Sequence, residues 1–315
     1  MKPMTTPTPV CDGYFADPFV WEADGVYYAV GTGRVEVDGA DGDTDRVIPL
    51  LTSPDLVNWR SLGEAMAQTD LTRGQQIWAP EVARGNDGAF YLYYSVGSDH
   101  QLRVARSETP GGVYTDRGVW LTATDRDIPF AIDASVFKDD DGTFYLFYAR
   151  DYLDTVSGHA GTGLAVDRLE TMMRLAGQET PVLRAQYGWT LFQENRQVHG
   201  VTWDWHTIEG AHVRKRHGWY WLLFSGSAWT TANYGVDYAV ADTVRGPYTG
   251  EATDKPRLLS TELTGLAGPG HNSMVTTPSG DDYLVYHAWN AAHTKRQMHI
   301  ERLFWTPDGP RRGAI

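Results

Sequence analysis

The chain has 315 residues, with 27 lysines and arginines against 40 aspartates and glutamates, which gives a net charge of −13. This acidic balance excludes a broad basic face for nucleic acid or an anionic membrane, and no apolar run is long enough to span a bilayer. The N-terminal segment MKPMTTPTPVCDG lacks the apolar core of a secretion signal, so a cytoplasmic protein and a secreted protein whose signal has been removed both fit.

The single cysteine, Cys11, excludes an intrachain disulfide, and we interpret it as incidental. Short runs rich in valine and aromatic residues, bounded by glycine, proline and aspartate, are typical of an all-β protein. The best helical candidate is the weakly periodic segment 164–175. We expect one domain that covers residues 1–315.

Five stretches share one pattern, a short strand with a valine, a polar turn with glycine, and an aromatic strand. In chain order they are DPFVWEADGVYYAVGT from Asp17, APEVARGNDGAFYLYYS from Ala79, DASVFKDDDGTFYLFYA from Asp133, EGAHVRKRHGWYWLLFSG from Glu209 and HNSMVTTPSGDDYLVYHA from His271. Such a repeat predicts a β-propeller with five blades, and the innermost strand of each blade would line a central channel.

The residues that begin these stretches form one column, three or four positions before the repeat valine. Asp17, Asp133, Glu209 and His271 would then converge at one end of the channel. A single aspartate at a strand start is usually a turn or cap residue. Three carboxylates in the same repeat position favour a shared site instead.

Paired carboxylates without a cysteine nucleophile indicate glycoside hydrolysis, in which one acid protonates the leaving oxygen. Asp133 neighbours Glu209 in blade order, and a like charge raises a carboxyl pKa, so Glu209 is the predicted acid and Asp133 its modulator. Asp17 lies further from Glu209, across the fifth blade. That separation would leave room for a water molecule between the two carboxyl groups, which is the arrangement of an inverting enzyme.

Several motifs together resemble glycoside hydrolase family 43. They are Asp17-Pro18, the strand Ile132-Asp133-Ala134-Ser135-Val136-Phe137, Ile208-Glu209-Gly210, Trp78-Ala79-Pro80-Glu81, Gly268-Pro269-Gly270-His271-Asn272-Ser273 and LTSPDLVNW at residues 51–59. The resemblance implies a five-bladed propeller and an inverting mechanism. Carried over, it makes Asp17 the general base, Glu209 the general acid, and Asp133 the residue that tunes and orients the acid.

Two departures from related patterns bear on this reading. Ala134 stands where many family relatives have proline, which we expect to be tolerated because the neighbouring aspartate and Ser-Val are kept. The retaining, invertase-like propellers begin with Asn-Asp-Pro-Asn and carry an Arg-Asp-Pro motif. Neither is present in this chain, so we reject fructan hydrolysis.

Predicted substrate-contacting residues lie beside the motifs; they are Trp78, Phe130, Trp203, Trp205, His271 and Arg296. Apolar sugar faces stack on aromatic rings, although each of these aromatics could equally fill a blade interface. For His271 three interpretations stay open. It is a packed histidine, a ligand of a calcium ion in the channel together with waters, as in family relatives, or a catalytic group. The acidic loop 38–45 is a weaker cation candidate, since its spacing matches no EF-hand.

The predicted function is an exo-acting α-L-arabinofuranosidase on plant cell-wall arabinan or arabinoxylan oligosaccharides, with no nucleic-acid or membrane partner and no organic cofactor. A β-xylosidase and an endo-1,5-α-L-arabinanase are the alternatives among enzymes. The chain ends at Ile315 without the β-sandwich that larger β-xylosidases of the family append, which favours release of arabinose. A carbohydrate-binding propeller without catalysis is the alternative of another class, but a lectin needs no carboxylate triad.

Overall fold

The computed structural model describes residues 6–33, 48–66, 76–97, 100–122 and 130–313, and nearly all regular structure there is β-strand. The exceptions in this part of the chain are the short helix α1 (Thr261–Thr264) and the 3-10 turn η3 (Gly188–Thr190). The predicted all-β class is therefore confirmed. Within the described ranges, no helix is long and apolar enough to cross a membrane. The acidic loop 38–45 lies outside the described residues.

Three antiparallel sheets each consist of four strands that follow one another along the described chain. The first contains β1 (Ala16–Ala23), β2 (Val26–Thr32), β3 (Pro49–Ser53) and β4 (Arg60–Glu64). The second contains β5 (Ile77–Arg84), β6 (Phe90–Val96), β7 (Gln101–Ser107) and β8 (Thr115–Trp120). The third contains β18 (Ala267–Thr276), β19 (Asp282–Trp289), β20 (Arg296–Thr306) and β21 (Gly309–Gly313).

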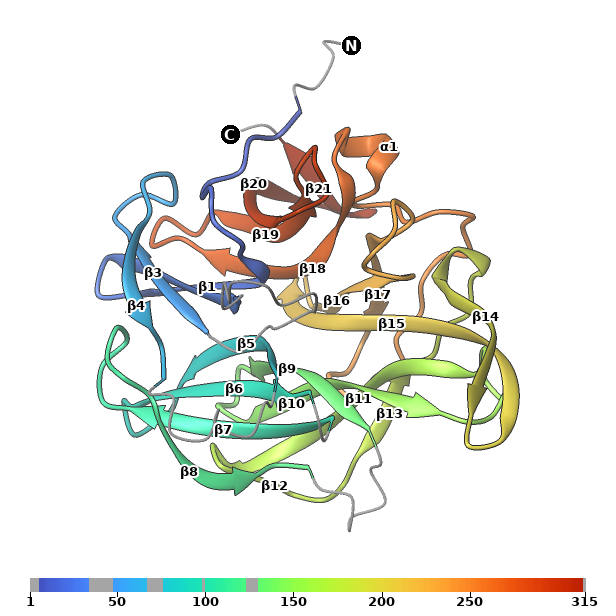
Figure 1. Cartoon of the computed structure of the whole chain (residues 1–315). Coiled ribbons are helices and arrows are strands. Elements are labelled where there is room, and N and C mark those ends of the chain that lie inside the picture. The colour runs from blue at the N-terminus through green and yellow to red at the C-terminus, as the bar shows by residue number, and fades with distance from the viewer. Residues whose placement is uncertain (1–5, 34–47, 67–75, 98–99, 123–129, 314–315) are drawn as a thin grey trace.

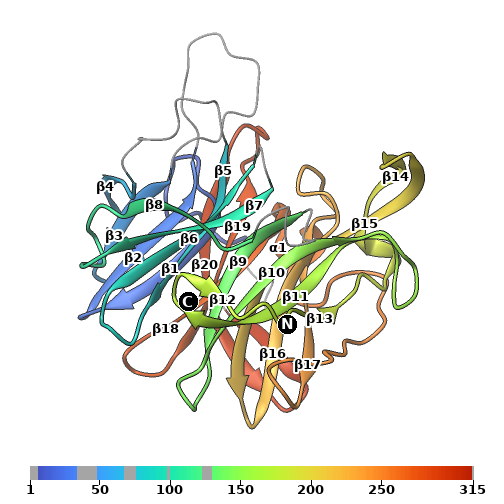
Figure 2. The ribbon, with the colours of Figure 1, turned by 90° about the horizontal axis from the view of Figure 1, so that it is seen from below.

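The remaining strands join in a nine-stranded sheet. They are β9 (Ala131–Lys138), β10 (Phe144–Tyr152), β11 (Gly161–Thr171), β12 (Arg174–Leu175), β13 (Thr180–Leu183), β14 (Leu191–Val198), β15 (Val201–Arg216), β16 (Trp219–Gly226) and β17 (Gly235–Ala241). Two antiparallel groups, β9–β11 and β15–β17, are linked by a two-residue parallel pairing of β11 with β15. The β14–β15 hairpin stands out from the other strands (Figures 1 and 2).

The predicted helix at residues 164–175 is wrong, because this segment lies in strands β11 and β12. β11 pairs with β10 along most of its length. Its first seven residues are buried on both faces of the sheet. A strand that is covered on both faces carries apolar residues at every spacing, and such a run imitates helical periodicity.

The sequence repeat reappears in the backbone as five equivalent hairpin turns. Each connects an inner strand to its partner and contains a glycine with φ between 81° and 88°; these are Gly25, Gly88, Gly142, Gly218 and Gly280. Only glycine adopts this left-handed conformation at no steric cost, which explains the fixed glycine in the polar turn of the pattern.

A β-bulge with one left-handed residue interrupts each of the five inner strands. The bulge residues are Asp17, Ala79, Asp133, Gly210 and His271, with φ between 44° and 59°. This corrects the predicted column at one position, because Gly210 holds the equivalent place and Glu209 precedes it. Gly210 lies three residues before the repeat valine, as the bulge residues of the first three copies do, whereas Glu209 lies four residues before it.

The amide groups of these bulge residues link each inner strand to the neighbouring group of strands. Four of them donate to a side chain at the end of a second strand: Ala79 N–H to Thr32 Oγ1 (2.8 Å), Asp133 N–H to Ser95 Oγ (2.9 Å), His271 N–H to Ser225 Oγ (2.7 Å) and Asp17 N–H to His287 Nδ1 (3.0 Å). The fifth, Gly210 N–H, donates to Asp133 Oδ2 at 3.2 Å. Buried amides require such partners, so the bonds hold the bulges in fixed positions.

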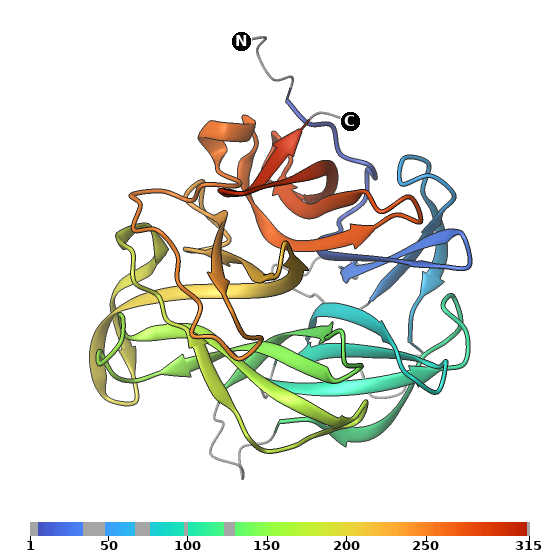
Figure 3. The same cartoon turned by 180° about the vertical axis from the view of Figure 1, so that it is seen from behind.

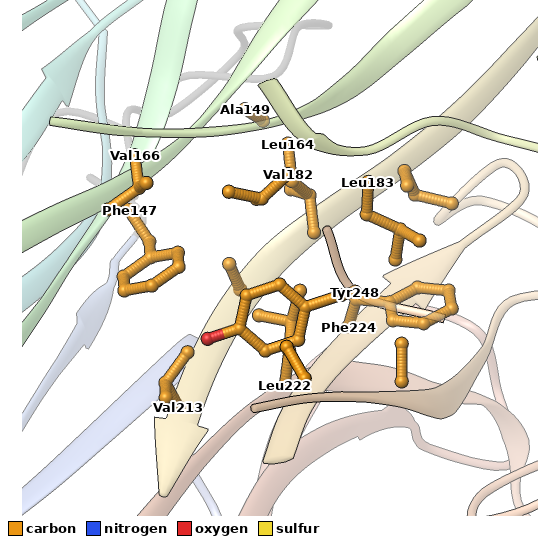
Figure 4. Packing of buried hydrophobic residues seen from close by; sticks show 14 of the residues in the cluster. Phe147, Ala149, Leu164, Val166, Val182, Leu183, Val213, Leu222, Phe224 and Tyr248 are labelled. Carbon is orange, nitrogen blue, oxygen red and sulfur yellow. The ribbon is translucent and has the colours of Figure 1, made fainter. Parts of the chain in front are cut away.

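The inner strands β1, β5, β9, β15 and β18 contact one another in this order, and β18 contacts β1. Figure 1 shows them grouped about the centre, with β4, β8 and β21 further out. Separate hydrophobic clusters fill the spaces between neighbouring groups of strands. In one of them Phe147 and Leu164 face Leu222 and Phe224 (Figure 4).

The described N-terminal segment lies beside β20 and is hydrogen-bonded to it. Val10 N–H donates to the carbonyl oxygen of Met298 at 2.8 Å, and Phe15 N–H donates to that of Arg296 at 2.9 Å. The two ends of the described chain therefore lie on the same side of the molecule (Figure 3). This contact brings the start of β1, which carries Asp17, against the last sheet.

Candidate active site

The three predicted catalytic carboxylates line one cavity of about 130 Å³ at the centre of the inner strands. Three other predicted residues, Trp78, His271 and Arg296, line it as well. Ile132 and Trp229 complete the wall. The expected convergence of Asp17, Asp133 and Glu209 is therefore what the geometry shows. The chemical roles of these residues do not follow from location alone and require their electrostatics.

Asp17 is a buried carboxylate surrounded by donors. Its Oδ2 accepts a hydrogen bond from Thr32 Oγ1 at 2.6 Å, and its Oδ1 lies 3.2 Å from Nη1 of Arg296. Burial alone would raise the pKa of Asp17, but Arg296, His271 and His287 hold it well below its usual range. Burial lowers the pKa of both histidines, to about 4 for His287, so the guanidinium is the permanent charge that keeps Asp17 ionised.

Arg296 is itself a fixed element of the site rather than a mobile surface side chain. It is buried, and its Nε and Nη2 donate to the phenol oxygen of Tyr14 at 2.9 and 2.7 Å. Its guanidinium lies 4.2 Å from the centre of the Trp229 ring. A planar, always charged group held from three sides is suited to orienting a carboxylate.

Glu209 has a different environment, with a neutral phenol as its hydrogen-bond partner among the described residues. Tyr234 donates from its hydroxyl to Oε1 of Glu209 at 2.6 Å. Burial raises the pKa of Glu209 to about 7; the Tyr234 hydrogen bond opposes this shift and the charge of Asp17 adds to it. Near neutral pH a large fraction of Glu209 is therefore protonated. Burial therefore raises the pKa of Glu209 more than a neighbouring charge does, whereas the sequence pattern pointed to the charge.

Along the ring of inner strands, Asp133 on β9 lies between Asp17 on β1 and Glu209 on β15. Its Oδ2 accepts the Gly210 N–H, so it touches the residue that follows Glu209. Burial, followed by the charges of Glu209 and Asp17, raises the pKa of Asp133 well above its usual range. Electrostatic repulsion between two carboxylates is mutual, so Asp133 and Glu209 titrate as a pair.

His271 lies at the cavity wall, with its Nδ1 3.5 Å from Oδ1 of Asp17. Atoms of Asp133, Glu209 and His271 lie within 4.8 Å of one another, so these three residues can hold a cation. Calcium takes six to eight oxygen ligands, whereas this group offers two carboxyl groups with raised pKa values and one nitrogen. The protein donors alone do not fit calcium, and waters would have to complete its shell.

The predicted aromatic contacts fall into two groups. Trp78 lines the cavity and packs against His100, whose ring stacks on Phe130 at 5.0 Å. Trp205 is only 1% exposed and lies under the guanidinium of Arg196, so its predicted contact with a sugar is wrong. Trp203 pairs with Arg196 in the β14–β15 hairpin and does not line the cavity. Buried indoles pack in the core even when they flank a motif.

Four residues of the site were missed by the sequence argument. Trp229 forms part of the cavity wall and stacks on Trp289 at 6.0 Å. Tyr234 and Thr32 donate to the two carboxyl groups, and His287 accepts the Asp17 N–H. A signal existed for Thr32 and His287, because both end the aromatic strand of a repeat copy, as Ser95 does. Trp229 and Tyr234 lie in a segment outside the repeat, which offered no comparable signal.

Comparison with known proteins gives one consistent family. The model of Glycosyl hydrolases family 43 matches residues 6–310. A β-D-galactofuranosidase of Aspergillus niger is 28% identical and aligns with 96% of this chain and 82% of its own length. An α-L-arabinofuranosidase of Humicola insolens and an extracellular exo-α-(1→5)-L-arabinofuranosidase of Streptomyces avermitilis are each 26% identical over 93% of this chain. The chain spans 60% of the length of each of these two relatives.

Solved structures agree with the sequence relatives. The crystal structure of a thermostable family-43 glycoside hydrolase superposes with a TM-score of 0.80 at 26% identity, covering 99% of this chain and 96% of that one. An endo-1,4-β-xylanase from Bacteroides thetaiotaomicron gives a TM-score of 0.77 at 28% identity, with 98% and 97% coverage. Similarity on this scale covers all the strands that form the cavity.

Proposed function

Because this chain belongs to the glycosyl hydrolases of family 43, we propose that it is an inverting, exo-acting α-L-arabinofuranosidase that acts on arabinan or arabinoxylan oligosaccharides. The observation that carries the proposal is a pair of carboxyl groups that line one cavity with opposite pKa shifts, Asp17 lowered and Glu209 raised. An ionised base together with a protonated acid is the state that glycoside hydrolysis requires at the start of a turnover.

In the proposed mechanism Asp17 accepts a proton from a water molecule as that water attacks the anomeric carbon. Glu209 gives its proton to the glycosidic oxygen as the bond to the leaving sugar breaks. The attack comes from the face opposite the leaving group, so the product has the inverted anomeric configuration. Asp133 orients Glu209 through the Gly210 amide, and the two carboxyl groups titrate as a pair because they repel each other when both are ionised. Arg296 keeps Asp17 ionised before the water binds.

We also propose that the scaffold is a five-bladed propeller, in which the nine-stranded sheet counts as two blades. The two-residue parallel pairing of β11 with β15 would then be a contact between blades rather than part of one blade. The five inner strands in a ring, the five equivalent turns and the hydrophobic clusters between neighbouring groups of strands support this count. Propeller blades usually have four strands around a central channel.

The choice of sugar rests on the relatives. Two of the three reported relatives are named as arabinofuranosidases, and the third is a β-D-galactofuranosidase. The two sugars share a five-membered ring and differ in the exocyclic group, so a galactofuranoside is the second candidate substrate. A β-xylosidase and an endo-arabinanase are further alternatives within the family, and both activities are named among the relatives.

The proposal is tested by turnover of the 4-nitrophenyl glycosides of α-L-arabinofuranose, β-D-galactofuranose and β-D-xylopyranose, together with linear arabinan. We expect the arabinofuranoside to give the highest kcat/KM and arabinan to release only monosaccharide. NMR spectra taken early in the reaction should show the inverted anomer first. A higher kcat/KM on another glycoside would change the sugar, and longer products would make the enzyme endo-acting. Binding without turnover would favour the carbohydrate-binding alternative.

A calcium ion held by His271 and waters is a separate part of the proposal, and no step of the mechanism depends on it. Calorimetric titration of the chelated protein with calcium should give one site that His271→Ala removes. Retained calcium binding in that variant would place the ion elsewhere. Because His271 lies beside Asp17, the binding measurement is more direct than activity.

A further inference from the structure

Tyr234 is the one described hydrogen-bond partner of Glu209, and the mechanism above gives it no role. It directly precedes β17, and its side chain is 0% exposed. Its hydroxyl lies 2.6 Å from Oε1 of Glu209, and no other acceptor for it is found in the described part of the chain. A buried phenol with a single acceptor has one favourable orientation, so the hydroxyl points at the carboxyl group.

Two neighbours hold the ring in place. On one side it stacks on His287, with ring centres 5.9 Å apart and an angle of 10° between the planes. The ring also packs against Gly270, where a Cβ atom would stand 2.2 Å from Cε1 of the tyrosine ring. Gly270 does not have a positive φ, so space for Tyr234, and not backbone conformation, excludes a side chain at this position.

We propose that Tyr234 is a positioning residue for the general acid, which holds Oε1 as a hydrogen-bond acceptor so that the acidic proton is carried on Oε2. This inference rests on the proposed role of Glu209. A neutral carboxyl group has one hydroxyl oxygen and one carbonyl oxygen, and the carbonyl oxygen is the better acceptor. Donation to Oε1 therefore assigns the proton to the oxygen that remains for the substrate. Burial raises the pKa of Tyr234 well above its usual value, so the phenol keeps its proton and stays a donor.

The same chain segment also contributes to the cavity wall. Trp229 lines the cavity and lies five residues before Tyr234, and the Tyr234 N–H donates to the carbonyl oxygen of Thr231 at 3.3 Å. The Trp229 carbonyl oxygen in turn accepts from the Trp289 indole at 3.0 Å. The wall that would contact the sugar and the phenol that orients the acid thus belong to one anchored connection.

The test is Tyr234→Phe, which keeps the ring and removes the hydroxyl. A residue that aligns the proton affects reactions in proportion to their need for protonation of the leaving group. With 1,5-α-arabinobiose we expect kcat to fall about 10- to 100-fold at unchanged KM, the range for one hydrogen bond to an ionisable group. With 4-nitrophenyl α-L-arabinofuranoside, whose phenol leaves readily, we expect less than about threefold. If wild type prefers another sugar, the matching disaccharide and nitrophenyl glycoside replace this pair.

A matched control separates positioning from stability. Tyr93 is likewise 0% exposed and donates its hydroxyl to one acceptor, the Met172 carbonyl oxygen, away from the cavity. Tyr93→Phe should lower the unfolding temperature by a similar amount and leave both kcat values unchanged. An equal loss on both substrates in folded Tyr234→Phe, or no loss on either, would overturn the proposal.

Gly270→Ala provides a second route that keeps the hydroxyl. The added methyl group would overlap the Tyr234 ring and displace it with its hydroxyl, so the same dependence on the leaving group is expected. Loss on the disaccharide alone supports the proposal, whereas an equal loss on both substrates contradicts it. A wild-type protein without glycosidase activity would refute the proposed function itself, and that outcome is distinct from either variant's result.

Discussion

The two sides of the cavity stabilise opposite states of the same chemical group. On one side Asp17 lies against a guanidinium, a threonine hydroxyl and two histidines, and its carboxylate is held ionised. On the other side Glu209 has a neutral phenol, and burial keeps its proton on. Desolvation raises the pKa of both groups, so it is common to them. The difference shows that the charge of the partner decides which carboxyl group ionises in such a site.

The largest expected effect comes from removing the two groups themselves. Glu209→Ala should cost oligosaccharide hydrolysis most of the roughly 10² to 10⁴-fold that general acid catalysis contributes, and should cost an aryl glycoside with an acidic phenol much less. Asp17→Ala should cost both substrates alike, because water must be activated whatever leaves. The measurement is kcat/KM of both variants on both substrates. The reverse pattern would mean that the two roles are exchanged.

The second-largest effect is expected from removing the charge that distinguishes the two sides of the cavity. Arg296→Gln leaves Asp17 buried without its guanidinium, so the pKa of Asp17 should rise. One opposite charge at this distance shifts a carboxyl pKa by about 1 to 3 units, so the acidic limb of the kcat/KM profile should move up by that amount. Arg257→Gln is the control, because Arg257 pairs with buried Asp237 at 2.7 Å in another part of the molecule. An unmoved acidic limb would mean that Asp17 does not set it.

The Asp133→Asn substitution tests the environment of Glu209, on the other side of the cavity. Wild type should lose activity as pH rises through about 7, where Glu209 gives up its proton. Asp133 and Glu209 repel each other when both are ionised, and an amide removes this repulsion, so the pKa of Glu209 should fall. The alkaline limb of the kcat/KM profile should therefore move to lower pH, with reduced activity on its plateau. Full activity with an unchanged alkaline limb would show that Asp133 is structural only.

The smallest effect is expected from Thr32→Val, which removes a hydroxyl group that makes two hydrogen bonds. Thr32 Oγ1 donates to Asp17 and accepts the Ala79 N–H. The acidic limb should rise less than in Arg296→Gln, and the orphaned amide should cost about 1 to 3 kcal/mol of the free energy of unfolding. Thr32→Ser keeps the hydroxyl and should resemble wild type in both measurements. Equal behaviour of the valine and serine variants would contradict this assignment.

Those parts of the site that belong to the repeat could be predicted from the sequence. Asp17 and Asp133 were placed by the column, because both are bulge residues of inner strands. Glu209 was found one position before the bulge residue Gly210, because the column admitted residues at either three or four positions before the valine. The opposite pKa shifts were not predictable in size, because burial depends on how five distant strands meet.

The remaining errors have other physical causes. Trp205 and Trp78 both flank motifs and are chemically identical, yet one is buried beneath Arg196 and the other lines the cavity. Tyr234 lies in a connection that no other copy of the repeat shares, so no comparison within the chain could identify it. The segment 164–175 was misread because burial on both faces of a strand removes the alternation that normally identifies it.

The hydrogen bond from the Asp17 amide to His287 joins residues that are 270 positions apart in the chain. During synthesis Asp17 leaves the ribosome well before His271, His287 and Arg296. Contacts of such high sequence separation form late, because the long loop between them must first be closed. Catalytic competence should therefore be the final event of folding, and recovery of activity after refolding would time the docking of the last sheet onto the first.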